Sequence, residues 1–320
     1  MRRSVGLIGL QGKMTTPIVL FVYARPEHTK RTIEALLNNR GSSAHDLIVF
    51  SDAPRTPDKI YAVTAVREYL KTVKGFRSVT VHYRVQNLGL ANSIITGVKQ
   101  VLSEHERVIV LEDDMVTSPY FLDYMNEGLD RFAADERVIS IHGYVYPVQQ
   151  PLPEAFFLPG ADCWGWATWR RGWRLFNPDG RALLNELRRR GLLEAFDFNG
   201  AYSYSRMLEG QIKGKNDSWA VRWHASAFLA GKLTLYPGRS LVRNIGLDDS
   251  GTHCGDDSAL DVSLSPQPID FTKLGEVAIC EEARQAIEDF LRDSSRRRNS
   301  QIWRKFKNLF CARHGTQKPN

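Results

Sequence analysis

The sequence predicts an α/β fold in which a mostly parallel β-sheet carries helices on both faces. Two observations lead to this prediction. Short apolar runs alternate with amphipathic stretches through residues 17–111, which is the pattern of strands and helices in a parallel sheet. The composition, with 42% hydrophobic and 25% charged residues over 320 positions, suits a globular chain with a sizeable core.

Four apolar runs are predicted to form strands, and three amphipathic segments between them are predicted to form helices. The strands are expected at 17–23, 46–51, 79–85 and 107–111, and the helices at 28–37, 60–70 and 93–103. The apolar runs are continuous and rich in β-branched residues, as in strands that are buried on both faces. In open sheets of this kind ligands bind where the strands end, so the residues directly after each strand are the expected site.

The second half of the chain is less regular. Its expected elements are short strands at 137–142 and 233–236, helices at 183–196 and 218–230, a tryptophan-rich segment at 160–176, and a helical, basic tail from residue 281. No internal repeat is present.

Charge, cysteines and hydropathy narrow the class of protein. The net charge of +7 is compatible with a phosphorylated small substrate, an acidic membrane surface or a nucleic acid. The four cysteines form no CxxC pair, which argues against zinc-ribbon and thioredoxin-like sites and fits a reducing compartment. No apolar run reaches the roughly 20 residues of a transmembrane helix, and the apolar stretch at 5–10 is too short for a signal peptide. We therefore expect a cytoplasmic protein.

An acidic cluster, Glu112-Asp113-Asp114, directly follows the fourth predicted strand. Three adjacent carboxylates repel one another unless a cation or a basic group neutralises them. Mg²⁺ and Mn²⁺ prefer carboxylate and phosphate oxygens, so the cluster is suited to a metal that bridges a diphosphate. The plain alternative is a solvated turn before the next helix, with Ser118 as its N-cap.

The sequence around this cluster resembles the DxD region of GT-A fold glycosyltransferases, particularly bacterial sugar transferases of the family 2 type and the N-acetylglucosaminyltransferase I group. The resemblance covers roughly residues 17–255 and is carried by IVLFVYARPEHTKRTIEAL, FSDAPR, NLGL, EDDMVTSPYFL and DSWAVRW. It implies a GT-A fold and transfer of a sugar from a nucleotide-sugar, expected to be a UDP-sugar, to a hydroxyl of a glycan or lipid-linked glycan in polysaccharide biosynthesis.

The resemblance also implies roles for residues at the strand ends. Asp114 would bind Mn²⁺ or Mg²⁺, with Glu112 and Asp113 near the ribose and nucleotide. His253, late in the sequence, would complete the metal shell; the alternative is a histidine of a surface loop. The other strand-end residues would line the nucleotide pocket: Tyr23, Ala24, Arg25, Asp52 and Asn87.

Transfer with inversion requires a carboxylate that takes the proton from the attacking hydroxyl. The resemblance assigns this role to Asp217, and the alternative is that Asp217 or Ser218 caps the helix that follows. Asn216 departs from the family, in which many members carry an acidic residue at that position. Glu209 is a weaker substitute for the base.

The segment from Cys163 to Trp173 holds four of the seven tryptophans. Trp166, Trp169 and Trp173 have near-helical spacing and are expected in the core. Trp164, together with Asp162, is the better candidate for contact with the donor sugar or the acceptor, and the family has a similar WGWATW string.

The basic tail contains a run at 296–298 and a stretch at 303–310 with its aromatic and aliphatic residues on one face. That pattern is typical of an interfacial helix on an anionic bilayer, which gives the hypothesis of peripheral attachment to the inner face of the cell membrane. A solvated terminal helix is the alternative, and no nucleic-acid partner is expected.

These expectations divide the chain into a GT-A domain at 15–265 and a helical, basic tail at 266–320. Within the domain, 15–115 would bind the nucleotide and 116–265 the acceptor. A sugar nucleotidyltransferase would share the sheet, but it should carry a glycine-rich loop after the first strand, and the loop here, Tyr23 to Pro26, has no glycine. A non-catalytic sugar- or membrane-binding protein on the same fold is the other alternative. A P-loop around Gly12-Lys13 lacks a preceding strand.

Overall fold

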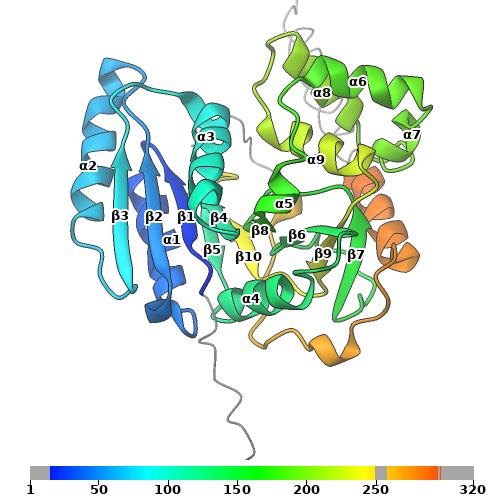
Figure 1. Ribbon diagram of the computed structural model, residues 1–320, viewed down its shortest axis with the longest axis horizontal. Coiled ribbons are helices and arrows are strands. Elements are labelled where there is room, and N and C mark those ends of the chain that lie inside the picture. Colours follow the sequence, from blue (N-terminus) through cyan, green and yellow to red (C-terminus); the bar gives the residue numbers. More distant parts are fainter. Residues whose placement is uncertain (1–14, 249–257, 295, 297–320) are drawn as a thin grey trace, which may run out of the picture.

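The structure is a computed structural model that describes residues 15–248, 258–294 and 296. A single eight-stranded sheet runs through both halves of the molecule (Figure 1). Its strands are β1 (Ile18–Val22), β2 (Asp46–Ser51), β3 (Ser78–Tyr83), β4 (Arg107–Glu112), β6 (Val138–His142), β7 (Ala155–Pro159), β8 (Trp166–Trp169) and β9 (Leu233–Pro237). They lie in the order β3-β2-β1-β4-β8-β6-β9-β7.

The four strands predicted in the first half are present and pair in parallel. β1 lies between β2 and β4, with Ile18 opposite Leu47 on one side and Ile109 on the other. β8 is antiparallel to both β4 and β6, and β7 is antiparallel to β9, while β6 and β9 are parallel. The predicted α/β class with a mostly parallel sheet is confirmed, and the architecture is consistent with a GT-A fold.

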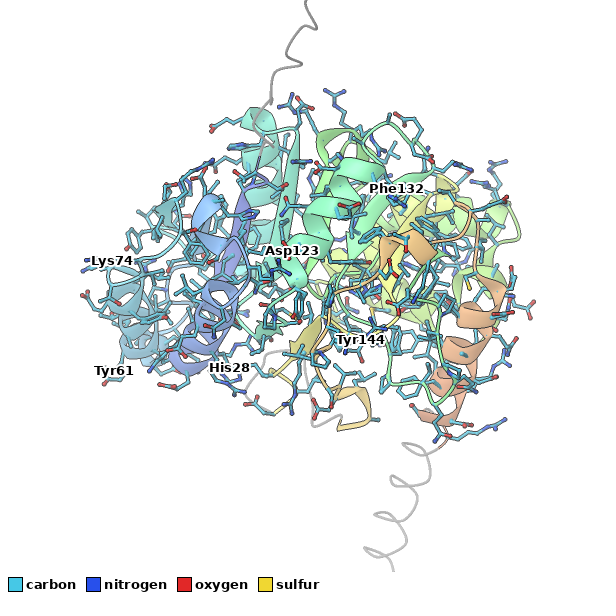
Figure 2. The ribbon with its side chains drawn as sticks, turned by 90° about the horizontal axis from the view of Figure 1, so that it is seen from below. His28, Tyr61, Lys74, Asp123, Phe132 and Tyr144 are labelled. Carbon is cyan, nitrogen blue, oxygen red and sulfur yellow. The ribbon has the colours of Figure 1, made fainter. Side chains whose placement is uncertain are left out.

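Helices cover both faces of this sheet, as predicted. One face carries α1 (Pro26–Leu37), α2 (Ile60–Leu70) and α4 (Phe121–Arg131), and the other carries α3 (Gly89–Glu104), α5 (Arg170–Trp173) and α9 (Trp219–Leu229). Side chains of β1 alternate between the two cores, with Leu20 packed on the α1 side and Phe21 on the α3 side. Alternation follows from the two-residue period of a strand, and burial on both sides explains why the run is apolar throughout. Figure 2 shows Tyr61 and Lys74 at the outer edge of the half of the molecule that contains β1, β2 and β3.

Two of the three predicted core tryptophans, Trp166 and Trp173, pack with Trp219 on the α3 side of the sheet, and Trp169 lies in the core on the α4 side. Trp166 of β8 lies with its ring centroid 5.6 Å from Trp173 of α5 and 5.5 Å from Trp219 of α9. Trp166, Trp169 and Trp173 are each at most 8% exposed. Large aromatic side chains contribute much of the burial energy of a core, so this cluster fixes the start of α9 against the sheet.

The single helix predicted over 183–196 is wrong. The chain forms α6 (Gly180–Arg189) and α7 (Leu193–Phe196) instead. Gly191 separates them with φ +66°, a left-handed conformation that ends helices and favours glycine. Together with α8 (Tyr204–Ile212), these helices pack on α9 through their leucines and Phe196.

The helical segment predicted from Glu281 is present over residues 281–294. Ala283, Ile287 and Leu291 bury one side of it against Phe198 and Tyr236. The basic residues after Arg296 lie outside the described residues. Within the described part of the chain, no helix combines the length and apolar character needed to cross a membrane.

Candidate active site at the strand ends

The acidic cluster lies where β1 and β4 end side by side. Arg25, three residues after β1, donates from Nη2 to Asp114 Oδ2 at 2.8 Å and to Asp113 Oδ1. The backbone N–H of Tyr23 donates to the second oxygen of Asp113 at 3.3 Å. The parallel pairing of the two strands brings these residues together, because parallel strands present their carboxyl ends at one edge of the sheet.

The cluster is buried and its charges are strongly coupled. Asp113 and Asp114 are each 4% exposed. Burial opposes the charge of Arg25, but the two aspartates outweigh it and raise the pKa of the guanidinium above its usual range. Loss of water raises the pKa of the half-buried Glu112 to about 8, with further contributions from the charges of Asp114 and Asp113. One arginine therefore does not neutralise the three carboxyl groups.

The raised pKa of Glu112 predicts a pH dependence of stability. The folded chain keeps a proton on Glu112 that the unfolded chain releases near pH 4.5, so the associated stability is lost as the pH rises toward about 8. In the absence of divalent ions we expect a loss of roughly 2–4 kcal/mol over that range. Urea unfolding at several pH values gives the free energy of unfolding of wild type and of Glu112→Gln, and the difference between the two pH profiles measures the loss. Profiles that run parallel over this pH range would contradict the prediction.

One oxygen of the cluster is left without a partner. Oδ1 of Asp114 is buried and accepts no hydrogen bond, whereas Oδ2 is bound by Arg25. A buried carboxylate oxygen without a donor is costly unless an ion or water completes it, and a hard divalent cation is a suitable partner. The donor set at Asp114 thus fits the predicted metal. Among the described residues no three metal-ligating side chains are grouped as a complete site, and His253 lies outside them.

The chain that follows strand β10 (Val242–Asn244) crosses directly over Asp114. β10 pairs with β5 (Met115–Thr117), and the N–H of Ile245 donates to the backbone oxygen of Asp114 at 2.8 Å. A Cβ atom on Gly246 would lie only 2.1 Å from Asp114 Oδ2. His28 Nε2 lies 3.2 Å from the oxygen of Ile245. Neither Gly246 nor His28 was predicted at the site from the sequence, and the only signal at Gly246 is a glycine next to a strand.

Asp52 and Asn87 lie together at the ends of β2 and β3. The Asp52 carboxylate accepts the backbone N–H groups of Leu88 and Gly89 at 2.9–3.1 Å, and Asn87 donates to the Ala53 oxygen at 2.7 Å. Asp52 therefore holds the loop before α3 in place. A direct contact of Asp52 with the base stays a prediction.

Tyr23 and Ala24 lie between β1 and Arg25. The Tyr23 hydroxyl accepts the N–H of Arg55 at 2.9 Å, and both residues are half-buried. These two residues form the loop after β1, which lies between the acidic cluster and the loop at Asp52. The nucleotide was expected there from the sequence.

Trp164 approaches the site from the loop before β8. The backbone N–H of Trp164 donates to His142 Nε2 at 3.1 Å, and the centroid of its ring lies 4.7 Å from that of Tyr144. Burial raises the pKa of the neighbouring Cys163 thiol, and the charges of Asp162, Glu112 and Asp114 raise it further. Trp166, two residues after Trp164, pairs in antiparallel register with Val110, two residues before Glu112, so the 162–164 loop leaves the sheet next to the acidic cluster.

Asp217 stands just before α9. Ser218 is the N-cap, accepting the N–H of Val221 at 3.2 Å, so the capping alternative applies to Ser218. The Asp217 side chain is 59% exposed and pairs with Arg222 at 3.1 Å. The first residue of α9, Trp219, packs on Trp166, which is paired with Val110 near the end of β4. The helix therefore begins near the end of the sheet that carries the acidic cluster.

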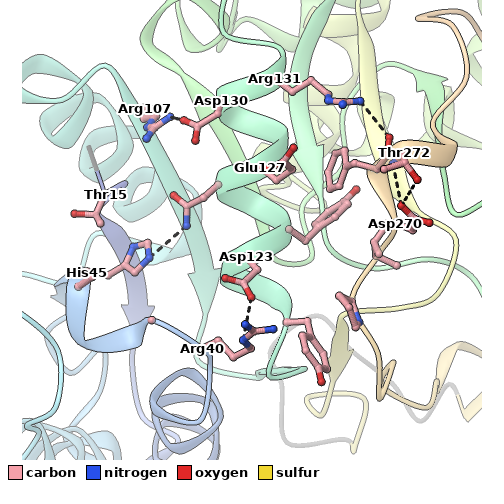
Figure 3. A pocket seen from close by; sticks show the side chains of 18 residues that line it. Thr15, Arg40, His45, Arg107, Asp123, Glu127, Asp130, Arg131, Asp270 and Thr272 are labelled. Carbon is pink, nitrogen blue, oxygen red and sulfur yellow. Dashed lines mark hydrogen bonds and ion pairs between the residues drawn. The ribbon is translucent and has the colours of Figure 1, made fainter. Parts of the chain in front are cut away.

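A cavity of about 640 Å³ lies elsewhere, at the edge where β1 and β4 begin (Figure 3). Thr15 and Arg107 mark that edge, and α4 forms one wall. Charged side chains that line the cavity pair with one another, for example Arg40 with Asp123 at 3.6 Å. This cavity is at the opposite end of the strands from the acidic cluster, so we do not assign it to the candidate site.

No protein-family model matches the sequence, and no curated protein matches it. Solved structures that align with the fold include sugar transferases. A mannosyltransferase from Pyrobaculum calidifontis, in complex with GDP-Man and Mn²⁺, is 13% identical with a TM-score of 0.36, over 68% of this chain and 71% of that one.

S. aureus TarS is 13% identical with a TM-score of 0.33, over 53% of this chain and 29% of TarS. A nucleotide-diphospho-sugar transferase from Desulfovibrio desulfuricans G20 is 12% identical with a TM-score of 0.33, over 55% of this chain and 76% of that one. At these TM-scores the likenesses assign no residue roles here.

Proposed function

We propose that this protein is a metal-dependent glycosyltransferase that uses a nucleotide-sugar and inverts the anomeric centre. The observation that carries the proposal is the unpartnered buried oxygen of Asp114 in a carboxylate cluster at the ends of parallel strands. Clusters of this kind suit a divalent cation and the diphosphate that it binds. The resemblance of the surrounding sequence to GT-A enzymes supports the same reading.

Asp114 would hold Mn²⁺ or Mg²⁺, with His253 as a proposed second ligand. When bound, the ion supplies Lewis-acid stabilisation of the diphosphate leaving group, so that no general acid is required. Arg25 can turn one of its N–H groups from the aspartates toward phosphate oxygens, since its guanidinium is already at the cluster and arginine binds phosphate well. The expected leaving nucleotide is UDP.

Asp217 would take the proton of the acceptor hydroxyl as that oxygen attacks the anomeric carbon. Its carboxylate is exposed and is therefore open to an acceptor from solvent. Its partner Arg222 lies 3.1 Å away, and a base in this position would take the proton of the acceptor hydroxyl. The proposed acceptor is a glycan or a lipid-linked glycan, and attachment of the basic tail to an anionic membrane remains a proposal.

Asp217→Asn is expected to lower kcat for sugar transfer by about 10²- to 10⁴-fold, the range for loss of a general base. Binding of the nucleotide-sugar with Mn²⁺ should change less than about threefold, because Asp217 is assigned to the acceptor. The matched control is Glu186→Gln, which breaks a surface pair with Arg189 and should leave kcat within about twofold. Unchanged transfer by Asp217→Asn would remove the assigned base.

The product distinguishes this proposal from the nucleotidyltransferase alternative. Incubation with a nucleotide-sugar, Mn²⁺ and a glycan acceptor should release a nucleoside diphosphate. Release of pyrophosphate from a nucleoside triphosphate and a sugar phosphate would favour the alternative instead.

A further inference from the structure

The loop that joins β7 to β8 is held in place by two buried histidines. His224 on α9 places Nδ1 2.9 Å from the oxygen of Ala161, and His142 at the end of β6 accepts the N–H of Trp164. A Cβ atom on Gly160 would lie 2.4 Å from the His224 ring, and Gly160 has φ +86°. The loop is therefore closely fitted to its surroundings, and Asp162 stands in its middle.

Only one oxygen of the Asp162 carboxylate accepts a short backbone hydrogen bond. Oδ1 accepts the N–H of Cys163 at 2.8 Å. Oδ2 has a long contact of 3.5 Å from the Tyr236 hydroxyl and lies 4.0 Å from Nδ1 of His142. The side chain keeps 23% of its surface exposed. An ionised carboxylate oxygen normally accepts shorter bonds, of 2.5–2.9 Å, so Oδ2 has capacity for another donor.

His142 presents an unused donor to the same space. Its Nε2 accepts the N–H of Trp164 at 3.1 Å, and burial lowers the pKa of the ring, so the neutral imidazole carries its proton on Nδ1. His142 is 0% exposed, and Nδ1 makes no hydrogen bond of good geometry, although the backbone of Tyr144 is near enough to oppose the lowering of the ring's pKa by burial. A buried N–H without an acceptor is costly, and here it faces Asp162.

Aromatic side chains surround this acceptor and donor. The Tyr236 hydroxyl lies 3.5 Å from Asp162 Oδ2, and the rings of Tyr236 and Tyr144 lie 4.9 and 6.2 Å from that of His142. Trp164 follows two residues later. A polar pair among aromatic walls is the usual composition of a site for a small polar ligand.

We propose that Asp162 and His142 form a subsite that binds a hydroxyl group of a neutral sugar ring. A hydroxyl can donate to Asp162 Oδ2 and accept from His142 Nδ1–H at the same time, and it would satisfy both unused atoms. The subsite lies beside the diphosphate cluster, since His142 pairs with Trp166 and Trp166 pairs with Val110, two residues before Glu112. The inference rests on the proposed function and adds a specificity-determining residue to it.

The charge of Asp162 also selects the class of sugar. A uronic acid would bring a second carboxylate toward Oδ2, and like charges at short range are unfavourable. Neutral hexoses and N-acetylhexosamines carry hydroxyls without that repulsion. The bound hydroxyl can belong to the sugar of the donor or to the acceptor, and both use the same chemistry.

The test compares wild type, Asp162→Asn and Tyr236→Phe with Mn²⁺ present. One arm measures Kd for UDP, UDP-glucose, UDP-N-acetylglucosamine, UDP-glucuronate and GDP-mannose by calorimetry. The other arm measures KM for methyl glycoside acceptors with the donor that binds best. Loss of a hydrogen bond to a charged group corresponds to about a 10- to 100-fold change, and Tyr236→Phe, which removes only the hydroxyl, should give a smaller change in the same direction.

If the donor supplies the hydroxyl, Asp162→Asn weakens binding of the preferred nucleotide-sugar but leaves binding of UDP alone unchanged. If the acceptor supplies it, donor binding is unchanged and the acceptor KM rises. In wild type, UDP-glucuronate should bind no more tightly than UDP. The control Asp197→Asn removes a half-buried carboxylate that binds Ser205 and should change neither quantity.

Donor Kd and acceptor KM within twofold of wild type in both Asp162→Asn and Tyr236→Phe would overturn the subsite and mean that water alone fills the gap. Failure of the proposed function gives a different result, because wild type itself would then bind no nucleotide-sugar. In that case the subsite is rejected together with the proposed function. Should Asp162→Asn not fold, Tyr236→Phe decides the outcome, because it keeps the ring and its packing on Phe156.

Discussion

Asp114→Asn is expected to lower kcat/KM for sugar transfer by about a thousandfold or more. The substitution keeps the shape of the side chain and removes the charge of the oxygen that is buried without a partner. Stabilisation of a leaving group by a bound cation contributes several kcal/mol, and each 1.36 kcal/mol corresponds to a factor of ten in rate. Initial rates of transfer at saturating Mn²⁺ measure the effect, and the variant should also lose Mn²⁺-dependent binding of the nucleotide-sugar.

The matched control for this variant is Asp123→Asn. Asp123 is 50% exposed, pairs with Arg40 and lines the cavity at the opposite edge of the sheet. Its removal should leave transfer within about twofold, because exposed ion pairs contribute little. An Asp114→Asn enzyme that keeps more than a tenth of wild-type activity would show that Asp114 is not the metal ligand.

Arg25→Met is expected to cost about 3–5 kcal/mol of unfolding free energy at pH 7 in the absence of divalent ions. The variant removes the cation that bonds to both Asp113 and Asp114, and a buried charge without its partner is strongly destabilising. Urea unfolding in EDTA measures the loss. Addition of Mn²⁺ should restore more stability to the variant than to wild type, because the ion replaces the missing positive charge.

The control Arg189→Met breaks an exposed helical pair with Glu186 and should cost less than about 1 kcal/mol. A loss of similar size in both variants would mean that Arg25 contributes no more than a surface ion pair. The carboxyl groups of the cluster would then be neutralised by protonation alone.

The first half of the fold could be predicted from the sequence because its signals are local. Continuous apolar runs such as that of β1 are explained by burial on both faces, and parallel strands separated by helices follow one another in the sheet with few alternatives. The second half lacks such signals. β7 is followed in sequence by β8, which lies three positions away in the sheet. The turn at Gly191 depends on a left-handed glycine that a helical pattern does not reveal.

The candidate site divides in the same way. Arg25 and the acidic cluster meet because each follows a parallel strand, and that placement could be read from the sequence. His142 and Tyr236 lie on β6 and β9, whose order in the sheet is not sequential, and Gly246 follows β10, which pairs with β5 in a separate two-stranded sheet, so no local pattern identifies them. The Asp52 carboxylate holds the loop before α3, and its place in the nucleotide pocket stays a prediction.

The most direct test of the proposed function is a thermal-shift screen of nucleotide-sugars with and without Mn²⁺, run on wild type and Asp114→Asn. A ligand that binds only the folded state raises Tm. We expect at least one nucleotide-sugar to raise the Tm of wild type only when Mn²⁺ is present, and to leave Asp114→Asn unchanged. No shift of wild type with any nucleotide-sugar, or an equal shift in both proteins, would contradict a metal-dependent nucleotide-sugar site at Asp114.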